Sequence, residues 1–306
     1  PDSTGGRRCP GAGLAQPRHV DDRYRRRQPG GGPDLRPTLA SGSLLFLLLL
    51  AACSHALEAR DDLGNEVSLA QAAQRIVTLS PHATELVLSA GAGRRLVGIA
   101  AGGTPPGSLN TLPRIGGHGG LDREALLALQ PDLVIAWQSG NRASDLDWIA
   151  ATGIAVYRSE PASLQDIANT IRHIGNLSGT ASAAQTGAQT FERALHTPCM
   201  QLPAKPAYVI VWDRPAMTVG GRHWINDVLS AAGYRNVLDH LDRGVFPIAP
   251  EAVWGYAQLP RISLIRSFDH GDIDHLADLL SRPGPRLGEA IQMLCARRLR
   301  QAPAVE

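Results

Sequence analysis

The chain has 306 residues, of which 43% are hydrophobic, and its formal net charge is +2. This length is sufficient for one large or two modest globular domains. The nearly balanced charge argues against a nucleic-acid partner, because proteins that bind nucleic acid carry a clear excess of basic residues.

Residues 1–38 are rich in Pro, Gly and Arg and contain few apolar residues. A segment of this composition buries too little apolar surface to fold, so we expect it to be disordered. The chain does not begin with Met, and its first methionine is Met200. We therefore expect these residues to come from a start assigned upstream of the true one.

Residues 39–56 have the pattern of a secretory signal. Their apolar run, Leu44 to Ala52, is shorter than the about 20 residues that span a bilayer. Basic residues precede the run and small residues follow it, as in an export signal. Leu50-Ala51-Ala52-Cys53 resembles a lipobox, which would make Cys53 the lipidated first residue, whereas Ser54-His55-Ala56 suits ordinary signal peptidase. We favour the lipobox slightly, because Cys53 directly follows the apolar run. Either cleavage predicts an exported chain.

Strands and helices are expected to alternate from Arg75 onward. The predicted strands are 76–79, 96–99, the strand that ends at Trp137, and 154–157; the predicted helices are 84–90, 121–129 and 145–152. This alternation indicates a parallel sheet with helices on its faces. We assign residues 74–162 to a first α/β lobe.

The alternation of strands and helices stops at Ser163. The segment Ser163 to Asp166 is typical of a capping box, and Ile167, Ile171 and Ile174 repeat at helical spacing. Residues 163–198 are predicted to form a long linking helix, with a break near Gly175–Gly179. A strand over 208–212 then starts a second α/β lobe, residues 205–300. The predicted fold class is two α/β lobes with mostly parallel sheets joined by a long helix.

Trp137 lies where the third strand of the first lobe should end. The preceding residues, 133–136, are apolar without alternation, which indicates a strand buried on both faces. Polar and flexible residues, 138–141, follow the tryptophan. Because ligands of open α/β sheets lie beyond the carboxyl ends of strands, we predict that Trp137 forms the wall of a ligand site.

The two lobes also share a local pattern. "DREALLALQPDLVIAWQS" in the first lobe and "APEAVWGYAQLPRISLIRS" in the second both run Glu-Ala, apolar helix, Pro, strand. Glu124 and Glu251 occupy matching places near the helix starts. A favourable interaction with the helix dipole accounts for each glutamate separately, but not for its repetition in both lobes.

Three segments carry a resemblance to a known family. "RIVTLSPHATELVLSAG", "LDREALLALQPDLVIAWQSGN" and "SRPGPRL" resemble the cobalamin-binding branch of the ABC-transporter substrate-binding proteins. These belong to the helical-backbone group, the class III periplasmic-binding fold, which also carries siderophores and haem. The resemblance implies a monomeric, non-enzymatic protein that binds a corrinoid between two lobes. Cobalamin would be cargo rather than a cofactor, delivered to a permease dimer with its ATPase.

The resemblance also implies roles for individual residues. The ligand-binding positions that it suggests are Trp137, Trp212, Phe246, His118, Asp278 and Arg282. Arg282 is expected to anchor its loop rather than to read the ligand, and a His on a Gly-rich loop, such as His118, is more often solvated than a ligand. Glu124 and Glu251 match the positions that dock on arginines of the permease.

The chain departs from this family at three places. An aromatic residue expected around Ala101 is absent, and the segment between Ser267 and Asp278 is shorter than in relatives. Cys295 matches a family disulfide position whose partner position here is Ala232. Cys199 and Cys295 could instead pair in an oxidising compartment, although their distance does not follow from the sequence.

The same residues also bear on other functions. Haem in this fold would need an axial ligand, for which His118 and Tyr157 are candidates, and an anionic siderophore would favour Arg214 and Arg222. His82, His118 and His223 are scattered, so a zinc or manganese receptor is disfavoured. The sequence has no G-x-S-x-G elbow, Walker loop or H-E-x-x-H motif, which disfavours an enzyme.

Overall fold

A computed structural model of the chain describes residues 56–102, 107–116, 120–265 and 274–301. The predicted disordered segment, Cys53 with most of the signal segment, and His118 lie outside the described residues. The described residues all belong to one compact unit. Among the described residues, no helix is long and apolar enough to cross a membrane.

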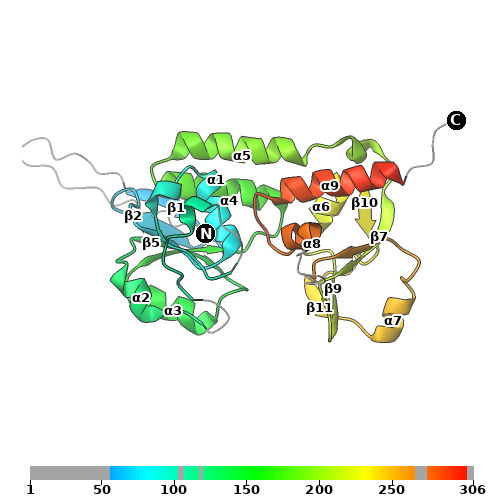
Figure 1. The fold of residues 1–306 in the computed structure, drawn as a ribbon, viewed down its shortest axis with the longest axis horizontal. Coiled ribbons are helices and arrows are strands. Elements are labelled where there is room, and N and C mark those ends of the chain that lie inside the picture. Colours follow the sequence, from blue (N-terminus) through cyan, green and yellow to red (C-terminus); the bar gives the residue numbers. More distant parts are fainter. Residues whose placement is uncertain (1–55, 103–106, 117–119, 266–273, 302–306) are drawn as a thin grey trace, which may run out of the picture. The chain divides into compact units, whose positions relative to one another are not determined.

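The N-terminal lobe is built on a four-stranded parallel sheet of order β4-β3-β5-β6 (Figure 1). Its elements are β3 (Ile76–Thr78), α1 (Pro81–Ser89), β4 (Leu96–Gly98), α2 (Arg123–Ala128), β5 (Leu133–Trp137), α3 (Ala143–Ala151) and β6 (Ala155–Ser159), with short 3-10 turns at Gly93–Arg95 and Gly107–Leu109. The alternation predicted from the sequence is confirmed. Leu133 to Ala136 are fully buried, as expected of a strand covered on both faces.

An antiparallel hairpin precedes the predicted start of this lobe at residue 74. It consists of β1 (Leu57–Arg60) and β2 (Glu66–Leu69). Asp62 follows β1, and its carboxylate accepts hydrogen bonds from the Tyr157 hydroxyl (3.0 Å) and the Thr170 hydroxyl (2.8 Å). Burial raises the pKa of Asp62 although these hydrogen bonds oppose the shift. The hairpin is therefore part of the folded lobe, which begins by residue 57.

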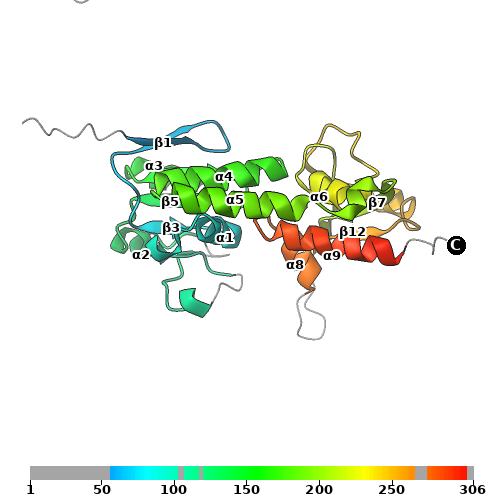
Figure 2. The ribbon, with the colours of Figure 1, turned by 90° about the horizontal axis from the view of Figure 1, so that it is seen from above.

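The segment predicted as one linking helix consists of two helices, α4 (Leu164–Leu177) and α5 (Ala181–Leu195), which lie side by side (Figure 2). The capping box is confirmed, because the Ser163 hydroxyl accepts from the Asp166 amide and the Asp166 carboxylate accepts from the Ser163 amide. The chain turns at Gly179, whose φ of +65° suits the left-handed residue that ends many helices. The expected break near Gly175–Gly179 is thus a full turn between two packed helices.

The C-terminal lobe contains two small sheets. A parallel sheet has the order β10-β7-β12, and a separate antiparallel sheet has the order β11-β9-β8. The elements are β7 (Lys205–Ile210), β8 (Trp212–Asp213), β9 (Ala216–Val219), α6 (Ile225–Ala231), β10 (Tyr234–Asn236), β11 (Val245–Pro247), α7 (Pro250–Trp254), β12 (Arg261–Ser263), α8 (His275–Leu280) and α9 (Leu287–Arg300). The strand predicted over 208–212 ends at Ile210, and Trp212 begins an antiparallel strand instead.

A disulfide between Cys199 and Cys295 joins the 3-10 turn Pro198–Gln201 to helix α9, with 5.7 Å between the two Cα atoms. A Cβ atom built at Gly233 would lie 3.2 Å from the Cβ of Cys199. Cys199 therefore packs against Gly233, the residue that follows Ala232. Ala232 is the position where the family resemblance suggested a partner for Cys295. The bridge is present, but its second cysteine comes from another segment of the chain.

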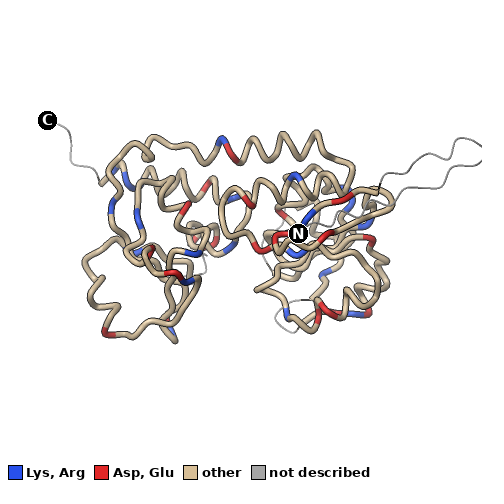
Figure 3. The backbone as a smooth tube through the Cα atoms, turned by 180° about the vertical axis from the view of Figure 1, so that it is seen from behind, with Lys and Arg blue, Asp and Glu red and all other residues tan. Residues whose placement is uncertain are grey.

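The largest apolar cluster connects the two lobes through helices. It includes buried residues of α1, α4, α5, α6 and α9. Helix α5 packs against α4, α1 and α9, and the amide of Leu164 donates to the Asp227 carboxylate of α6 at 3.0 Å. Along the described chain, Lys and Arg are interspersed with Asp and Glu (Figure 3), and the last turn of α9 carries Arg297, Arg298 and Arg300.

Candidate ligand-binding site

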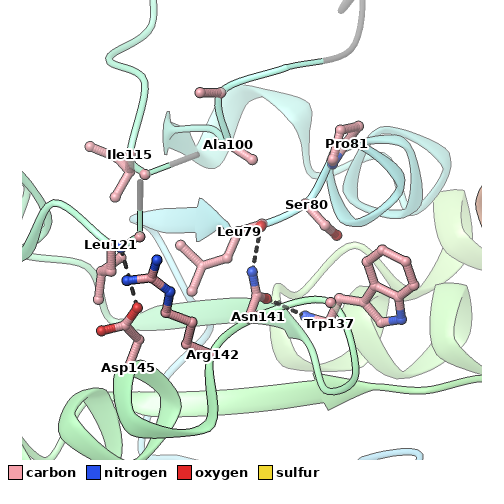
Figure 4. A pocket seen from close by; sticks show the side chains of 14 residues that line it. Leu79, Ser80, Pro81, Ala100, Ile115, Leu121, Trp137, Asn141, Arg142 and Asp145 are labelled. Atoms are coloured by element: carbon pink, nitrogen blue, oxygen red, sulfur yellow. Dashed lines mark hydrogen bonds between the residues drawn. The ribbon is translucent and has the colours of Figure 1, made fainter. Parts of the chain in front are cut away.

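A pocket of about 290 Å³ opens at the carboxyl ends of β3 and β5 (Figure 4). Its described lining residues are Leu79, Ser80, Pro81, Ala100, Ala101, Ile115, Gly116, Gly120, Leu121, Trp137, Gly140, Asn141, Arg142 and Asp145. They come from the segments that follow β3 and β4, from the end of β5 and from the start of α3. The pocket therefore lies where parallel α/β sheets place their ligands.

Trp137 forms one wall of this pocket, and its ring is held from two sides. A Cβ atom at Gly140 would lie 1.9 Å from Cε3 of Trp137, so only glycine allows the indole to pack this closely on the loop. The His82 ring meets the indole edge-on, with 4.9 Å between centroids and an interplanar angle of 87°. The structure thus places Trp137 at a pocket wall, as predicted, and its contact with a ligand stays a prediction.

Asn141 ties the two strand ends together beneath the pocket. Its side-chain oxygen accepts from the Trp137 amide at 2.8 Å, and its amide nitrogen donates to the Leu79 carbonyl at 3.0 Å. Figure 4 shows both hydrogen bonds. One side chain therefore fixes the distance between the end of β5 and the turn after β3.

Arg142 and Asp145 are the charged residues among the described lining positions. Asp145 forms an ion pair with Arg123 at 3.1 Å and accepts from the Leu121 amide at 3.3 Å. The Arg142 guanidinium packs against the backbone at Gly120. The sequence reasoning missed both residues. The available signal was their place, at the end of the polar loop and in the first helical turn after the strand that Trp137 ends.

Behind Trp137, the "SRPGPRL" segment packs on helix α1. A Cβ atom at Gly284 would lie 3.1 Å from the Cβ of His82 and 2.9 Å from the Glu85 carboxylate. His82 is fully buried, and burial together with the Arg282 charge lowers its pKa to about 3. Burial raises the pKa of Glu85, although Arg282 and Arg286 oppose this shift. The segment thus braces the helix whose histidine supports the pocket wall.

Asp278, on helix α8, and Arg282, in the bracing segment, are not among the described lining residues of the pocket. Arg282 is 9% exposed and forms an ion pair with Asp278, while Arg286 lies 3.8 Å from the same carboxylate. These contacts agree with the expectation that Arg282 anchors its loop. A direct contact of either residue with a ligand stays a prediction.

The structure brings Trp212 and Phe246 onto the same antiparallel sheet of the C-terminal lobe. Trp212 pairs with Met217 and is 56% exposed, and its indole NH donates to the Arg214 carbonyl at 2.9 Å. Phe246 pairs with Thr218, and the Arg243 guanidinium lies 5.5 Å from its ring centroid. Neither aromatic residue lines the pocket of the N-terminal lobe.

The prediction that Tyr157 could be an axial ligand for haem is wrong. Its side chain is fully buried in the N-terminal lobe, and its hydroxyl donates to Asp62 and lies 3.0 Å from Nδ1 of His173. Arg222 pairs with Asp242 at 3.1 Å on the surface. Within the described ranges, no group of three or more His, Cys, Asp or Glu side chains is arranged to hold a metal ion.

The two predicted docking glutamates lie in equivalent places. Glu124 is in the first turn of α2 and Glu251 in the first turn of α7, and both side chains are exposed. In each lobe the helix precedes a strand of the parallel sheet, β5 or β12. The structure confirms the repeated pattern, and the binding role of the two residues stays a prediction.

Two α/β lobes, with a pocket at the strand ends of one of them, define the class of two-lobed ligand-binding proteins. The family model described as periplasmic binding protein matches residues 76–258, which is more than half of the chain. The chain belongs to this family. Its members are binding proteins of the periplasm.

Individual relatives narrow the comparison. A vitamin B12-binding protein of Vibrio vulnificus is 28% identical over 245 residues, which covers 72% of this chain and 89% of the relative. The crystal structure of the periplasmic vitamin B12-binding protein of Vibrio cholerae superposes with a TM-score of 0.62 at 25% identity, covering 75% of this chain and 99% of that one. A periplasmic heme-binding protein of Roseiflexus shares the fold, with a TM-score of 0.59, 23% identity and coverage of 73% and 97%.

Proposed function

We propose that this protein is the extracytoplasmic substrate-binding component of an ABC importer for cobalamin or a related corrinoid. The observation that carries the proposal is Trp137, an indole fixed at the wall of a strand-end pocket in a chain similar to vitamin B12-binding proteins. A rigid aromatic plane buries a large apolar area and loses little entropy on binding, which suits the flat face of a corrin.

The ligand is held between the lobes in this proposal. A pocket of about 290 Å³ accommodates only part of a corrinoid, so a second surface has to cover the remainder. Trp212 and Phe246 supply an exposed and a half-buried aromatic side chain on the C-terminal lobe. Asp278 and Arg282 then act mainly by bracing helix α1 behind Trp137. His118 is proposed as a further ligand contact.

The partner is a membrane permease dimer with its ATPase. Glu124 and Glu251 are exposed on equivalent helices, where they are proposed to meet arginines of the permease. The chain works as a monomer, and lipidation at Cys53 anchors it to the membrane surface. Cobalamin is transported rather than used, so the proposal includes no resident cofactor, metal site or enzymatic activity.

Haem or a ferric siderophore is the alternative ligand. The fold shared with the heme-binding protein of Roseiflexus supports it, whereas the buried Tyr157 does not. The two readings differ in chemistry, since haem iron requires an axial side chain and a corrin is held largely by packing against its faces.

The deciding experiment is a titration of residues 54–306 with cyanocobalamin by calorimetry, followed by co-elution of the coloured ligand on gel filtration. One-to-one binding that Trp137→Ala weakens supports the proposal. Hemin and a ferric siderophore are titrated in parallel. A folded sample that binds either of them, and not cyanocobalamin, would refute the corrinoid assignment.

A further inference from the structure

Helices α2 and α7 repeat an arrangement of two exposed side chains. Each has a glutamate in its first turn, Glu124 or Glu251, and a large apolar residue three positions later, Leu127 or Trp254. Residues three apart in a helix are neighbours on its surface. Leu127 is 47% exposed and Trp254 is 76% exposed. Each lobe therefore presents a carboxylate beside an exposed apolar side chain.

The opposite faces of these helices are packed into their lobes. Leu126 is fully buried, and Leu129 packs against the same cluster. After α7, the Tyr256 ring stacks on Tyr208 with 5.1 Å between centroids, and Val253 packs beside it. The exposure of Leu127 and Trp254 is thus a property of firmly held segments. Among the described residues, Trp254 is the most exposed of the large hydrophobic side chains. A single exposed apolar residue is ordinary on a protein surface, so the repetition of the pair in both lobes carries the inference.

The two carboxylates have no cationic partner in the part of the chain that the structure describes. The neighbouring Arg123 lies 4.8 Å from the Trp148 ring centroid and pairs with Asp145, so its charge faces its own lobe. Helix α7, Pro250–Trp254, contains no basic residue. Within each lobe, α2 and α7 lie at the end away from α5 and α9, which occupy the opposite side (Figure 1).

We propose that Glu124 with Leu127, and Glu251 with Trp254, form two matched docking half-sites for the importer permease. Each half-site takes a basic side chain of the permease next to an apolar depression. The arrangement occurs once per lobe, so it fits a partner that offers the same pair of features twice, as two-fold-related subunits do. This inference rests on the proposed importer function and adds an apolar component to its docking surface. Trp254 contributes more than Leu127, because an indole buries more area at an interface.

The test measures binding of the full chain to the permease–ATPase complex of its source cells, held in lipid nanodiscs. Trp254→Ala is expected to weaken docking at least about tenfold, and Leu127→Ala about threefold. Leu299→Ala, at an equally exposed leucine (45%) on α9, is the matched control and leaves docking unchanged. In about 0.5 M NaCl the effect of Glu251→Gln shrinks, because exposed charges are screened, while the effect of Trp254→Ala persists.

The outcomes separate this inference from the ligand assignment. Docking of Trp254→Ala and Leu127→Ala that is as tight as that of Leu299→Ala overturns the apolar half-sites. The same samples are titrated with cyanocobalamin. If the unmodified chain binds cyanocobalamin but not the nanodiscs, the docking surface is wrong and the ligand assignment stands. If it docks with the expected variant pattern but does not bind cyanocobalamin, the half-sites stand and the ligand assignment is wrong.

Discussion

The two lobes share an α/β architecture but differ in how their sheets are built and in where their candidate ligand-binding side chains lie. The N-terminal lobe has a four-stranded parallel sheet, and its strand ends form a pocket braced by Asn141, His82 and Gly140. The C-terminal lobe has three parallel strands, and its candidate aromatics lie on a separate antiparallel sheet. The first lobe is preorganised for a ligand, whereas the second presents Trp212 with 56% of its surface exposed.

This difference indicates how much each lobe contributes to ligand affinity. Preorganised side chains lose less entropy on binding, so Trp137 should provide most of the affinity. The C-terminal lobe divides its strands between two three-stranded sheets, and a disulfide links its ends across a sequence separation of 96 residues. We expect the C-terminal lobe to cover the ligand. We also expect the stability of this lobe to depend on the disulfide.

The largest expected effect concerns that bond. Replacing both Cys199 and Cys295 by Ser should lower the free energy of unfolding by about 3 kcal/mol, because a cross-link over a long loop restricts the unfolded chain. Denaturant unfolding of the variant, compared with that of the oxidised protein, measures the change, and the unmodified protein in reductant should be as unstable as the variant. Equal stability of the oxidised protein and the variant would show that the C-terminal lobe does not need the bridge.

The next expected effect compares aromatic side chains of the two lobes. Trp137→Ala should weaken cyanocobalamin binding by about 2 kcal/mol, the loss typical of a buried hot spot, and Trp212→Ala by about 1 kcal/mol. Calorimetry of both variants gives the ranking. Trp137→Phe is the control, since it retains an aromatic plane. A larger loss for Trp212 would reverse the assignment of the preorganised lobe.

The support behind Trp137 predicts a dependence on pH. Because the pKa of His82 is about 3 in the folded protein, the unfolded chain takes up this proton first as the pH falls below about 6.5. The contribution of His82 to stability is therefore complete above that pH and lost between it and pH 3. At about pH 5 the loss relative to neutral pH should be about 2 kcal/mol.

His82→Phe isolates this effect, since it keeps a ring against Trp137 and cannot take up a proton. The raised pKa values of Asp62 and Glu85 act in the opposite direction, because these carboxyls bind protons more readily in the folded state. They are present in both proteins and cancel in the difference. Parallel stability profiles of the two proteins between about pH 5 and pH 7 would contradict the burial of a neutral His82.

The smallest expected effect lies at the surface. Glu124→Ala and Glu251→Ala should each weaken docking to the permease by about 1 kcal/mol, as exposed charge pairs do, and should leave cyanocobalamin affinity unchanged. Uptake assays and nanodisc binding measure the first quantity, and calorimetry the second. Full uptake by the double variant would contradict the proposal that both glutamates belong to the docking surface and that the two helices have equivalent roles.

Local patterns in the sequence were enough for several features. The apolar run before Trp137, the capping box at Ser163 and the repeated Glu-Ala helices depend on neighbours within a few residues, and all three have the predicted structure. The hairpin before residue 74 was missed, because its short strands follow the signal segment and pack against β6 and α4, which come much later in the chain.

The sequence by itself determined the parallel N-terminal sheet, the position of Trp137 at a strand end and the two-lobe order, because strand–helix alternation and apolar periodicity follow from local spacing. Only the tertiary structure decided that Cys199 pairs with Cys295, that Arg142 and Asn141 line the pocket, and that the Arg282 segment braces His82. Each of these contacts joins distant parts of the chain, and their distances depend on how whole elements pack.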